Sequence, residues 1–261
     1  PRGELLASFR QQCRQCGMAT LRSPFVHHVG VDPFSLRDFA RGQDRTDELL
    51  PSKTGGDRPT VDLFFDHADW LVERHGLDSM VVPARAVDMS RQQRSLVVET
   101  TRGDLRAGRC VLALGHGGAY QRPGWATSLP DGAPLVHVWD DGFDPSTVGD
   151  ESVCIVGGAI TAAQLATSLA RPGRDVTMLT RSPLRVEQLE ADTEWMHPGR
   201  SDSLDAHPPG SKARDDVVQA ARNDGTIPPY VFRRLRRCIE RDLLELRHTV
   251  VEEATWTSGP I

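Results

Sequence analysis

The feature that most constrains the fold is the segment at residues 153–163, VCIVGGAITAA, in which an apolar run passes through two glycines into a helix-forming stretch. A strand, a glycine turn and a helix in this order form the first part of a dinucleotide-binding βαβ unit. The turn brings backbone N–H groups of a helix N-terminus against a pyrophosphate, where the helix dipole favours an anion. The segment therefore predicts a nucleotide site on a parallel α/β sheet.

The glycine spacing in this turn matches the pattern G-x-G-x-x-G/A except at its middle position. Gly157 stands at the tight turn, Ala162 is an accepted residue at the third position, and Ala159 replaces the middle glycine. The Ala159 methyl group is then expected where the backbone approaches the phosphates most closely. The candidate pyrophosphate site consists of Gly157, Gly158, Ala159, Ile160, Thr161 and Ala162.

The second strand of the unit, at residues 175–180, ends in Thr180-Arg181-Ser182. An NAD-binding unit usually carries Asp or Glu here, which accepts hydrogen bonds from the ribose 2′-OH. This position has no carboxylate, whereas the Arg181 guanidinium and its hydroxyl neighbours can bind a 2′-phosphate. Thr180 and Arg181 therefore favour NADP over NAD. The alternative interpretation is that Arg181 is a surface residue of a βα loop.

A glycine- and proline-rich stretch at residues 116–150 divides the chain. We expect a first domain over residues 1–150, linker included, and a nucleotide-binding domain over residues 151–261. The second domain is expected to contain a strand, a helix, a strand, an irregular stretch and a further helix, at residues 152–156, 161–170, 175–180, 190–213 and 231–246.

The first domain contains an amphipathic helix at residues 60–75, with an aromatic core face and Gly76 as its end. Short extended segments are expected to form a small sheet at residues 79–82, 84–89 and 95–101, with a turn at residues 102–104. The apolar residues at 109–115 are continuous and do not alternate, which predicts a strand buried on both faces. A further short extended segment is expected at residues 135–139.

Composition excludes several classes of protein. With 31 basic and 36 acidic side chains the net charge is -5, so no global field attracts nucleic acid or anionic lipid. No apolar run approaches the roughly 20 residues that span a bilayer. The first residues lack a signal-peptide pattern, and the odd number of cysteines, 5, argues against a disulfide framework. We expect a cytoplasmic protein without nucleic-acid or membrane partners.

Three other groups of residues could in principle form a site. Cys13 and Cys16 form a lone CxxC motif, which a redox dithiol would use, but no strand precedes it and no second pair completes a zinc site. The histidine spacings do not suit a metal, and none is expected. Arginines within residues 233–247 alternate with acidic residues, which favours a solvated, salt-bridged helix face over a phosphate site.

Taken together, these motifs resemble the FAD- and NAD(P)-dependent flavoprotein oxidoreductases, near the flavin-containing monooxygenases and the lysine and ornithine N-hydroxylases. In that family an NADP-binding domain is inserted into an FAD-binding domain. The strand ending at Gly115 resembles the second FAD motif, and this adds Gly115 to the candidate cofactor residues. The segments at residues 136–139 and 225–229 also resemble family segments. The resemblance implies an α/β fold of two Rossmann-like dinucleotide-binding domains.

The resemblance also implies FAD and NADP as cofactors and an NADPH-dependent monooxygenase. In such an enzyme NADPH reduces the flavin, and the reduced flavin and molecular oxygen form a peroxide that oxygenates a small-molecule nucleophile. The cofactors carry this chemistry, so no catalytic side chain is named. A disulfide or quinone reductase on the same scaffold and a non-catalytic NAD(P)-binding remnant are the alternatives.

The first domain departs from the family pattern. No strand, glycine-rich turn and helix precede Arg58 to hold an FAD pyrophosphate, and we expect this sequence to lack the closing FAD segment of the family. We therefore expect an incomplete FAD-binding domain in a chain truncated at its N-terminus and at its C-terminus. The substrate and the oligomeric state are left open.

Overall fold

The computed structural model describes residues 5–52, 56–114, 120–191, 195, 202–222 and 225–257. Its helices, with short 3-10 turns marked η, are α1 (Ala7–Gln15), α2 (Ser35–Gly42), η1 (Thr46–Glu48), α3 (Val61–His75), η2 (Leu77–Met80), α4 (Gly124–Thr127), η3 (Pro145–Thr147), α5 (Ile160–Leu169), α6 (Asp202–Asp205), α7 (Lys212–Ala221) and α8 (Pro229–Glu240). Its strands are β1 (Leu49–Leu50), β2 (Arg58–Pro59), β3 (Ala86–Gln92), β4 (Ser95–Thr100), β5 (Leu105–Ala107), β6 (Val153–Val156), β7 (Val176–Thr180), β8 (Arg185–Val186), β9 (Thr226–Ile227) and β10 (Glu245–His248).

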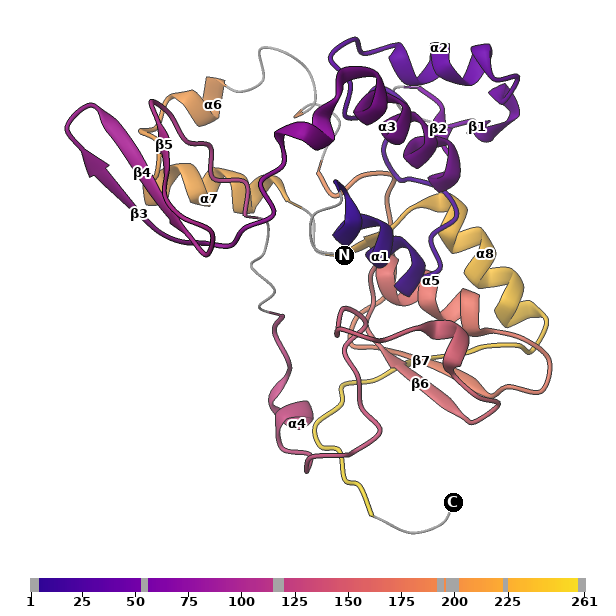
Figure 1. The fold of residues 1–261 in the computed structure, drawn as a ribbon. Coiled ribbons are helices and arrows are strands. Elements are labelled where there is room, and N and C mark those ends of the chain that lie inside the picture. The colour runs from indigo at the N-terminus through magenta and orange to yellow at the C-terminus, as the bar shows by residue number, and fades with distance from the viewer. Residues whose placement is uncertain are drawn as a thin grey trace.

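An N-terminal unit is built from α1, α2 and α3 around an apolar core that includes Leu36, Leu63 and Phe64 (Figure 1). The helix expected at residues 60–75 is confirmed as α3. Its N-terminus is capped by the Thr60 hydroxyl, which accepts a hydrogen bond from the Leu63 N–H, and its C-terminus is followed by Gly76 in the left-handed conformation at φ 60°.

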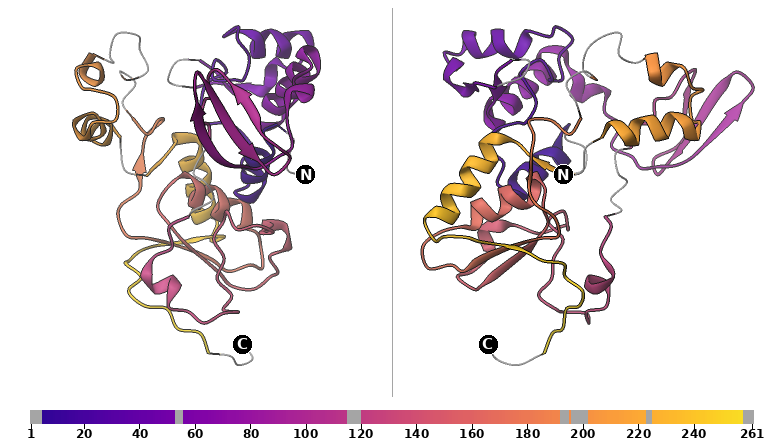
Figure 2. Two further views of the ribbon diagram at one scale, coloured as in Figure 1. Left: turned by 60° about the vertical axis from the view of Figure 1, so that its left-hand side comes forward. Right: turned by 180° about the vertical axis from the view of Figure 1, so that it is seen from behind.

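The small sheet expected in the first domain is also present. Strands β3, β4 and β5 pair antiparallel in that order, and the sheet stands out from the rest of the molecule (Figures 1 and 2). The prediction of an extended segment at residues 79–82 is wrong, because residues 77–80 form the 3-10 turn η2. The carbonyl of Gly76 accepts hydrogen bonds from the N–H and the hydroxyl of Ser79, which closes a turn in place of a strand.

The buried strand expected at residues 109–115 is not formed. Residues 109–114 have no regular structure, and Val111, Leu112 and Leu114 are between 65% and 88% exposed. An apolar run becomes a buried strand only where neighbouring strands take its backbone hydrogen bonds and cover its faces. Among the residues that the structure describes, no strand lies beside this run. The segment expected at residues 135–139 likewise forms no strand.

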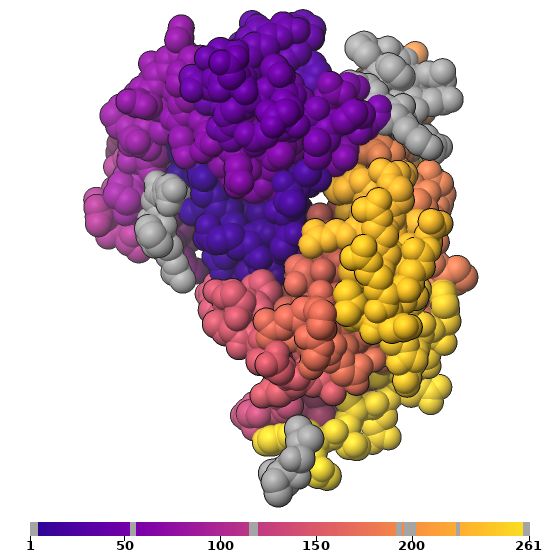
Figure 3. All heavy atoms as spheres, turned by 90° about the vertical axis from the view of Figure 1, so that its right-hand side faces the viewer, coloured from indigo at the N-terminus to yellow at the C-terminus, as the bar shows by residue number. Residues whose placement is uncertain are grey.

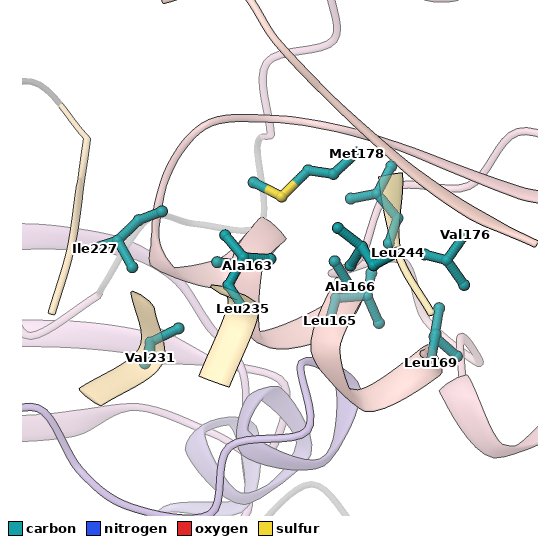
Figure 4. Packing of buried hydrophobic residues seen from close by; sticks show 11 residues of the cluster. Ala163, Leu165, Ala166, Leu169, Val176, Met178, Ile227, Val231, Leu235 and Leu244 are labelled. Atoms are coloured by element: carbon teal, nitrogen blue, oxygen red, sulfur yellow. The ribbon is translucent and has the colours of Figure 1, made fainter. Parts of the chain in front are cut away.

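The second unit is a parallel sheet of three strands in the order β10-β7-β6. Strand β6, helix α5 and strand β7 form the expected βαβ unit, and β10 adds a third strand beside β7. This order corresponds to the 3-2-1 half of a Rossmann sheet. Helices α5 and α8 lie side by side on one face of the sheet, where their side chains meet those of β7 (Figure 4).

The helix expected at residues 231–246 is too long, because α8 ends at Glu240 and β10 begins at Glu245. The chain leaves the helix through Asp242, which takes the left-handed conformation at φ 54°. The N–H groups of Asp242 and Leu243 donate to the carbonyls of Ile239 and Cys238, a Schellman ending without glycine. Leu246 continues the helical spacing by chance and belongs to strand β10.

The stretch expected to be irregular at residues 190–213 contains α6, and α7 begins near its end. In the described part of the chain, no helix is long and apolar enough to cross a membrane.

Candidate functional site

The glycine turn follows directly from the end of β6. The Gly157 N–H donates to the Leu179 carbonyl at 3.0 Å, which keeps the turn at the end of β7. Gly157 has a φ of +155°, and a Cβ added there would lie 3.0 Å from the Ala162 Cβ. Glycine is therefore required at this position by both backbone conformation and space.

The N-terminus of α5 has no side-chain cap in the described part of the chain. Its N-cap residue is Ala159, its first turn has no acidic residue, and its first backbone bond runs from the Ala163 N–H to the Ala159 carbonyl at 3.1 Å. The amides of the first turn therefore lack intrahelical acceptors. Residues 157–162 are half-buried. An uncapped helix end in this position can bind the phosphates of a nucleotide.

Ala159 fits the turn without strain, since its φ of -112° and ψ of -177° are ordinary extended values. Its methyl group lies against Gly225, where an added Cβ would be 2.7 Å from the Ala159 Cβ. The glycine spacing predicts this methyl group at the point of closest phosphate approach, and it does not reveal Gly225 as a neighbour. The only signal for Gly225 was its place before the Thr-Ile-Pro-Pro run.

The end of β7 lies beside the glycine turn. A Cβ added at Gly158 would be 3.6 Å from the Thr180 Cβ. Thr180 is 1% exposed, and its hydroxyl donates to the Ser182 carbonyl at 2.5 Å, so its proton is already engaged. Arg181 is exposed and has no hydrogen bond or ion pair to any described residue. Of these two side chains, the Arg181 guanidinium is therefore the one whose hydrogen-bond donors are not engaged by a described residue.

The structure thus brings residues 157–162 together with Thr180 and Arg181 at one edge of the sheet. Gly115, the candidate that came from the resemblance, lies outside the described residues.

The N-terminal unit contacts the nucleotide-binding unit through Arg22, which sequence analysis did not single out. Its guanidinium donates to the Gln188 carbonyl at 2.7 Å and to the Thr226 hydroxyl at 2.5 Å. It also forms an ion pair with Glu190 at 3.2 Å, while burial lowers its pKa. These contacts hold the segment after β8, and strand β9, against the N-terminal unit.

Both cysteines of the CxxC motif are buried: Cys13 packs in the core of the N-terminal unit, and Cys16, at the end of α1, faces α5. The Cys16 sulfur lies 3.6 Å from the side-chain oxygen of Gln164. Burial raises the pKa of Cys13 to about 12 and the pKa of Cys16 to about 11. A redox dithiol needs an accessible thiolate, so this environment does not favour a catalytic pair. Across the described ranges, no group of three or more His, Cys, Asp or Glu side chains is placed to hold a metal.

Comparison with known proteins assigns the chain to a family. The model of the pyridine nucleotide-disulphide oxidoreductase family matches residues 80–241. No curated protein matches the chain.

The chain is also similar to solved structures. L-lysine 6-monooxygenase from Pseudomonas syringae has a TM-score of 0.61 and 17% identity, over 93% of this chain and 62% of that one. An ornithine N-hydroxylase from Kutzneria sp. 744, solved with reduced FAD, NADP+ and L-ornithine, has a TM-score of 0.59 and 16% identity, over 91% and 62%. An ornithine hydroxylase from Pseudomonas aeruginosa has a TM-score of 0.58 and 14% identity, over 95% and 65%.

At these identities the likeness establishes the fold, and the α/β dinucleotide-binding architecture expected from the sequence is confirmed. The resemblance to the lysine and ornithine N-hydroxylases is confirmed at the same level. The chain spans between 62% and 65% of the length of these solved relatives.

Proposed function

The chain belongs to the pyridine nucleotide-disulphide oxidoreductase family, and we propose that residues 151–261 form its NADP-binding unit. The observation that carries this proposal is the uncapped N-terminus of α5 behind Gly157, with Arg181, which no described residue pairs with, beside it at the end of β7. Val138, Phe143 and Val148 pack against the core of this unit from the preceding linker.

In this proposal each group has a separate task. The amides of the first turn of α5 bind the pyrophosphate, and Gly157 gives the turn its shape. Arg181 binds the 2′-phosphate through charge-assisted hydrogen bonds. Thr180 holds the strand end through its bond to the Ser182 carbonyl. When bound, the reduced nicotinamide supplies a hydride.

Flavin binding requires a second nucleotide site. In the described residues, β6 and α5 form the strand–glycine turn–helix unit of one nucleotide site, and residues 109–114, which resemble the second FAD motif, are exposed and irregular. The described residues therefore fit NADP and do not by themselves fit FAD. We propose FAD as a cofactor of the whole protein and assign no residue of this chain to it.

For the whole protein we propose an NADPH- and FAD-dependent monooxygenase that oxygenates a small-molecule nucleophile such as an amino acid side-chain amine, with molecular oxygen as co-substrate. The fold likeness to the lysine and ornithine hydroxylases supports this proposal. The alternative of a disulfide reductase is less well supported, because Cys13 and Cys16, which form the CxxC motif of this chain, are buried and have raised pKa values. A soluble, cytoplasmic location is part of the same proposal.

The test has two parts. NADPH and NADH are titrated into the purified chain by calorimetry, and NADPH is expected to bind at least about tenfold more tightly, because charge-assisted contacts to the 2′-phosphate contribute about 1.5 to 3 kcal/mol. Equal affinities would contradict the NADP assignment.

Flavin absorbance near roughly 370 and 450 nm is then recorded with added FAD. If a stoichiometric yellow complex forms, NADPH oxidation and oxygen uptake are assayed with lysine and ornithine. A flavin complex that oxidises NADPH with a disulfide or quinone acceptor and takes up no oxygen would replace the monooxygenase proposal with a reductase.

A further inference from the structure

A cavity of about 490 Å³ lies where the N-terminal unit meets α5 and α8. Figure 3 shows this junction from the side of α8, with the N-terminal residues in indigo and purple against the yellow helix. Its polar lining includes Thr20 and Arg58 of the N-terminal unit, Gln164 and Thr167 of α5, and Tyr230, Arg233 and Arg234 of α8. None of the described candidate nucleotide residues lines it, so the cavity is a separate place in the fold.

Arg58 brings a buried positive charge into this cavity. Its side chain is 4% exposed, and one of its nitrogens donates to the Thr20 hydroxyl and to the Leu21 carbonyl, both at 3.1 Å. The guanidinium carbon lies 3.7 Å from the centre of the Tyr230 ring. No carboxylate among the described residues forms an ion pair with it. Buried charges are normally paired, so Arg58 lacks the anion that such a site requires.

Arg233 and Arg234 add two further charges from α8. Neither forms an ion pair within the described ranges, whereas Arg236 on the same helix pairs with Glu240 at 3.0 Å. The arginines of this helix were expected to form a salt-bridged face, and that holds for Arg236. Arg233 and Arg234, and Arg237 outside the cavity, form no ion pair within the described ranges.

The electrostatic environment of Arg58 is correspondingly unfavourable for its charge. Burial lowers the pKa of Arg58, and the nearby positive charge of Arg233 lowers it further. The aromatic ring and hydroxyl of Tyr230 act in the opposite direction without adding a formal negative charge. A bound anion would offset both the burial of Arg58 and its repulsion by Arg233, because its negative charge would attract the two guanidinium groups.

The first turn of α8 also borders the cavity. No side chain caps this turn, it contains no acidic residue, and both Tyr230 and Val231 line the cavity. The positive end of the helix dipole therefore adds to the three arginines.

We propose that this cavity binds a small organic anion whose phosphate or carboxylate group lies between Arg58, Arg233 and Arg234. The apolar part of such a ligand would pack on Leu50, Pro51 and Val231 at the rim. The site is independent of the NADP assignment, and its ligand would contact both the N-terminal unit and the nucleotide-binding unit.

The experiment uses two exposed double variants of the same helix. Arg233→Gln/Arg234→Gln removes two charges from the cavity, and Arg236→Gln/Arg237→Gln removes two charges outside it. Inorganic phosphate and succinate are titrated separately by calorimetry into the wild type and both variants. At least one probe is expected to bind the wild type and the control alike and to bind the cavity variant at least about tenfold more weakly.

The comparison between the two variants separates the cavity from the glycine turn, because phosphate bound at α5 would be unaffected by both. The proposal is supported if the cavity variant loses binding of phosphate, of succinate or of both. The probe that is lost identifies the anion. Equal affinities of the two variants for each probe, or no saturable binding of either probe to the wild type, would overturn it.

Discussion

The Nε2 atom of His67 lies 2.7 Å from the hydroxyl oxygen of Ser35, and this hydrogen bond joins α3 to the first residue of α2. His67 is 0% exposed, and its ring packs edge-on against His28 at 5.0 Å between ring centres. Its Nδ1 atom is buried without a hydrogen-bond partner in the described structure. Burial, and then the neighbouring His28, lower the pKa of His67 to about 4.

This environment predicts a pH dependence of stability. The unfolded chain takes up a proton on His67 near its ordinary pKa of 6.5, whereas the folded protein does so only near pH 4. The free energy of unfolding should therefore decrease as the pH falls from about 6.5 to about 4, by up to about 3 kcal/mol, and should not decrease further from this group below that range. Urea unfolding at a series of pH values measures the effect.

His67→Gln retains a hydrogen-bonding group for Ser35 and should remove most of the slope between about pH 6.5 and pH 4.5. His75→Gln, at the exposed end of the same helix, should keep it. Carboxylates such as Glu48, whose pKa is lowered by its hydrogen bond to Arg45, contribute mainly below this window. An unchanged slope in His67→Gln would show that another group is responsible.

The contact between Gly225 and Ala159 predicts a compensating pair of substitutions. Gly225→Ala would place a methyl group 2.7 Å from the Ala159 Cβ, and such overpacking usually costs about 1 to 3 kcal/mol. Adding Ala159→Gly removes the opposing methyl group, so the double variant should regain most of the lost stability. The strain lies at the N-terminus of α5, so Gly225→Ala should also weaken NADPH binding. Chemical denaturation and nucleotide titration of all four forms measure the coupling.

Gly108→Ala is the matched control for this cycle, because a Cβ added at Gly108 meets no atom within 4 Å. It should leave stability and nucleotide affinity within about 0.5 kcal/mol of the wild type. If the effects of Gly225→Ala and Ala159→Gly simply add, the two side chains do not share the space that the structure gives them.

The βαβ unit could be predicted closely because its signals are local. Apolar strand residues, the glycine turn and the alanine-rich helix follow one another between residues 153 and 180, and each boundary agrees with the structure to within a residue. The strand expected at residues 109–115 depended on partner strands that a local pattern does not reveal. The early end of α8 depended on Asp242 in a conformation usually associated with glycine.

In the candidate site, too, the residues with local sequence signals could be predicted and those brought together by the fold could not. Gly157 and Arg181 are recognised by their positions next to strands, which the sequence displays. The neighbours Gly225 and Ala159 are 66 positions apart in the sequence, and only the folded chain brings them together. The Thr180 hydroxyl appeared free to bind a phosphate until the structure placed the Ser182 carbonyl beside it.

The assignment of the 2′-phosphate contact to Arg181 predicts a change of cofactor preference. Arg181→Asp replaces the cation with a carboxylate that repels a phosphate and can accept hydrogen bonds from a ribose 2′-OH. NADPH affinity should fall at least about tenfold, and NADH affinity should remain equal or increase. Calorimetric titration with both cofactors measures the change.

Arg185→Asp is the control for this charge reversal, since Arg185 is also exposed and stands four positions further along the chain, on β8. It should reduce NADPH affinity by less than about threefold through the general field alone. Equal losses in the two variants would mean that net charge, and not a specific contact, determines the binding of NADPH.

The buried CxxC motif predicts a pattern of thiol reactivity that separates the monooxygenase and disulfide reductase proposals. Because only the thiolate reacts, the raised pKa values of Cys13 and Cys16 and their burial should protect both from iodoacetamide at about pH 8. Cys110 is exposed and should be modified first. Mass spectrometry of the native protein locates the label, and all 5 cysteines should react in urea. Labelling of Cys13 or Cys16 in the native protein as fast as Cys110 would instead indicate an accessible dithiol and favour the reductase.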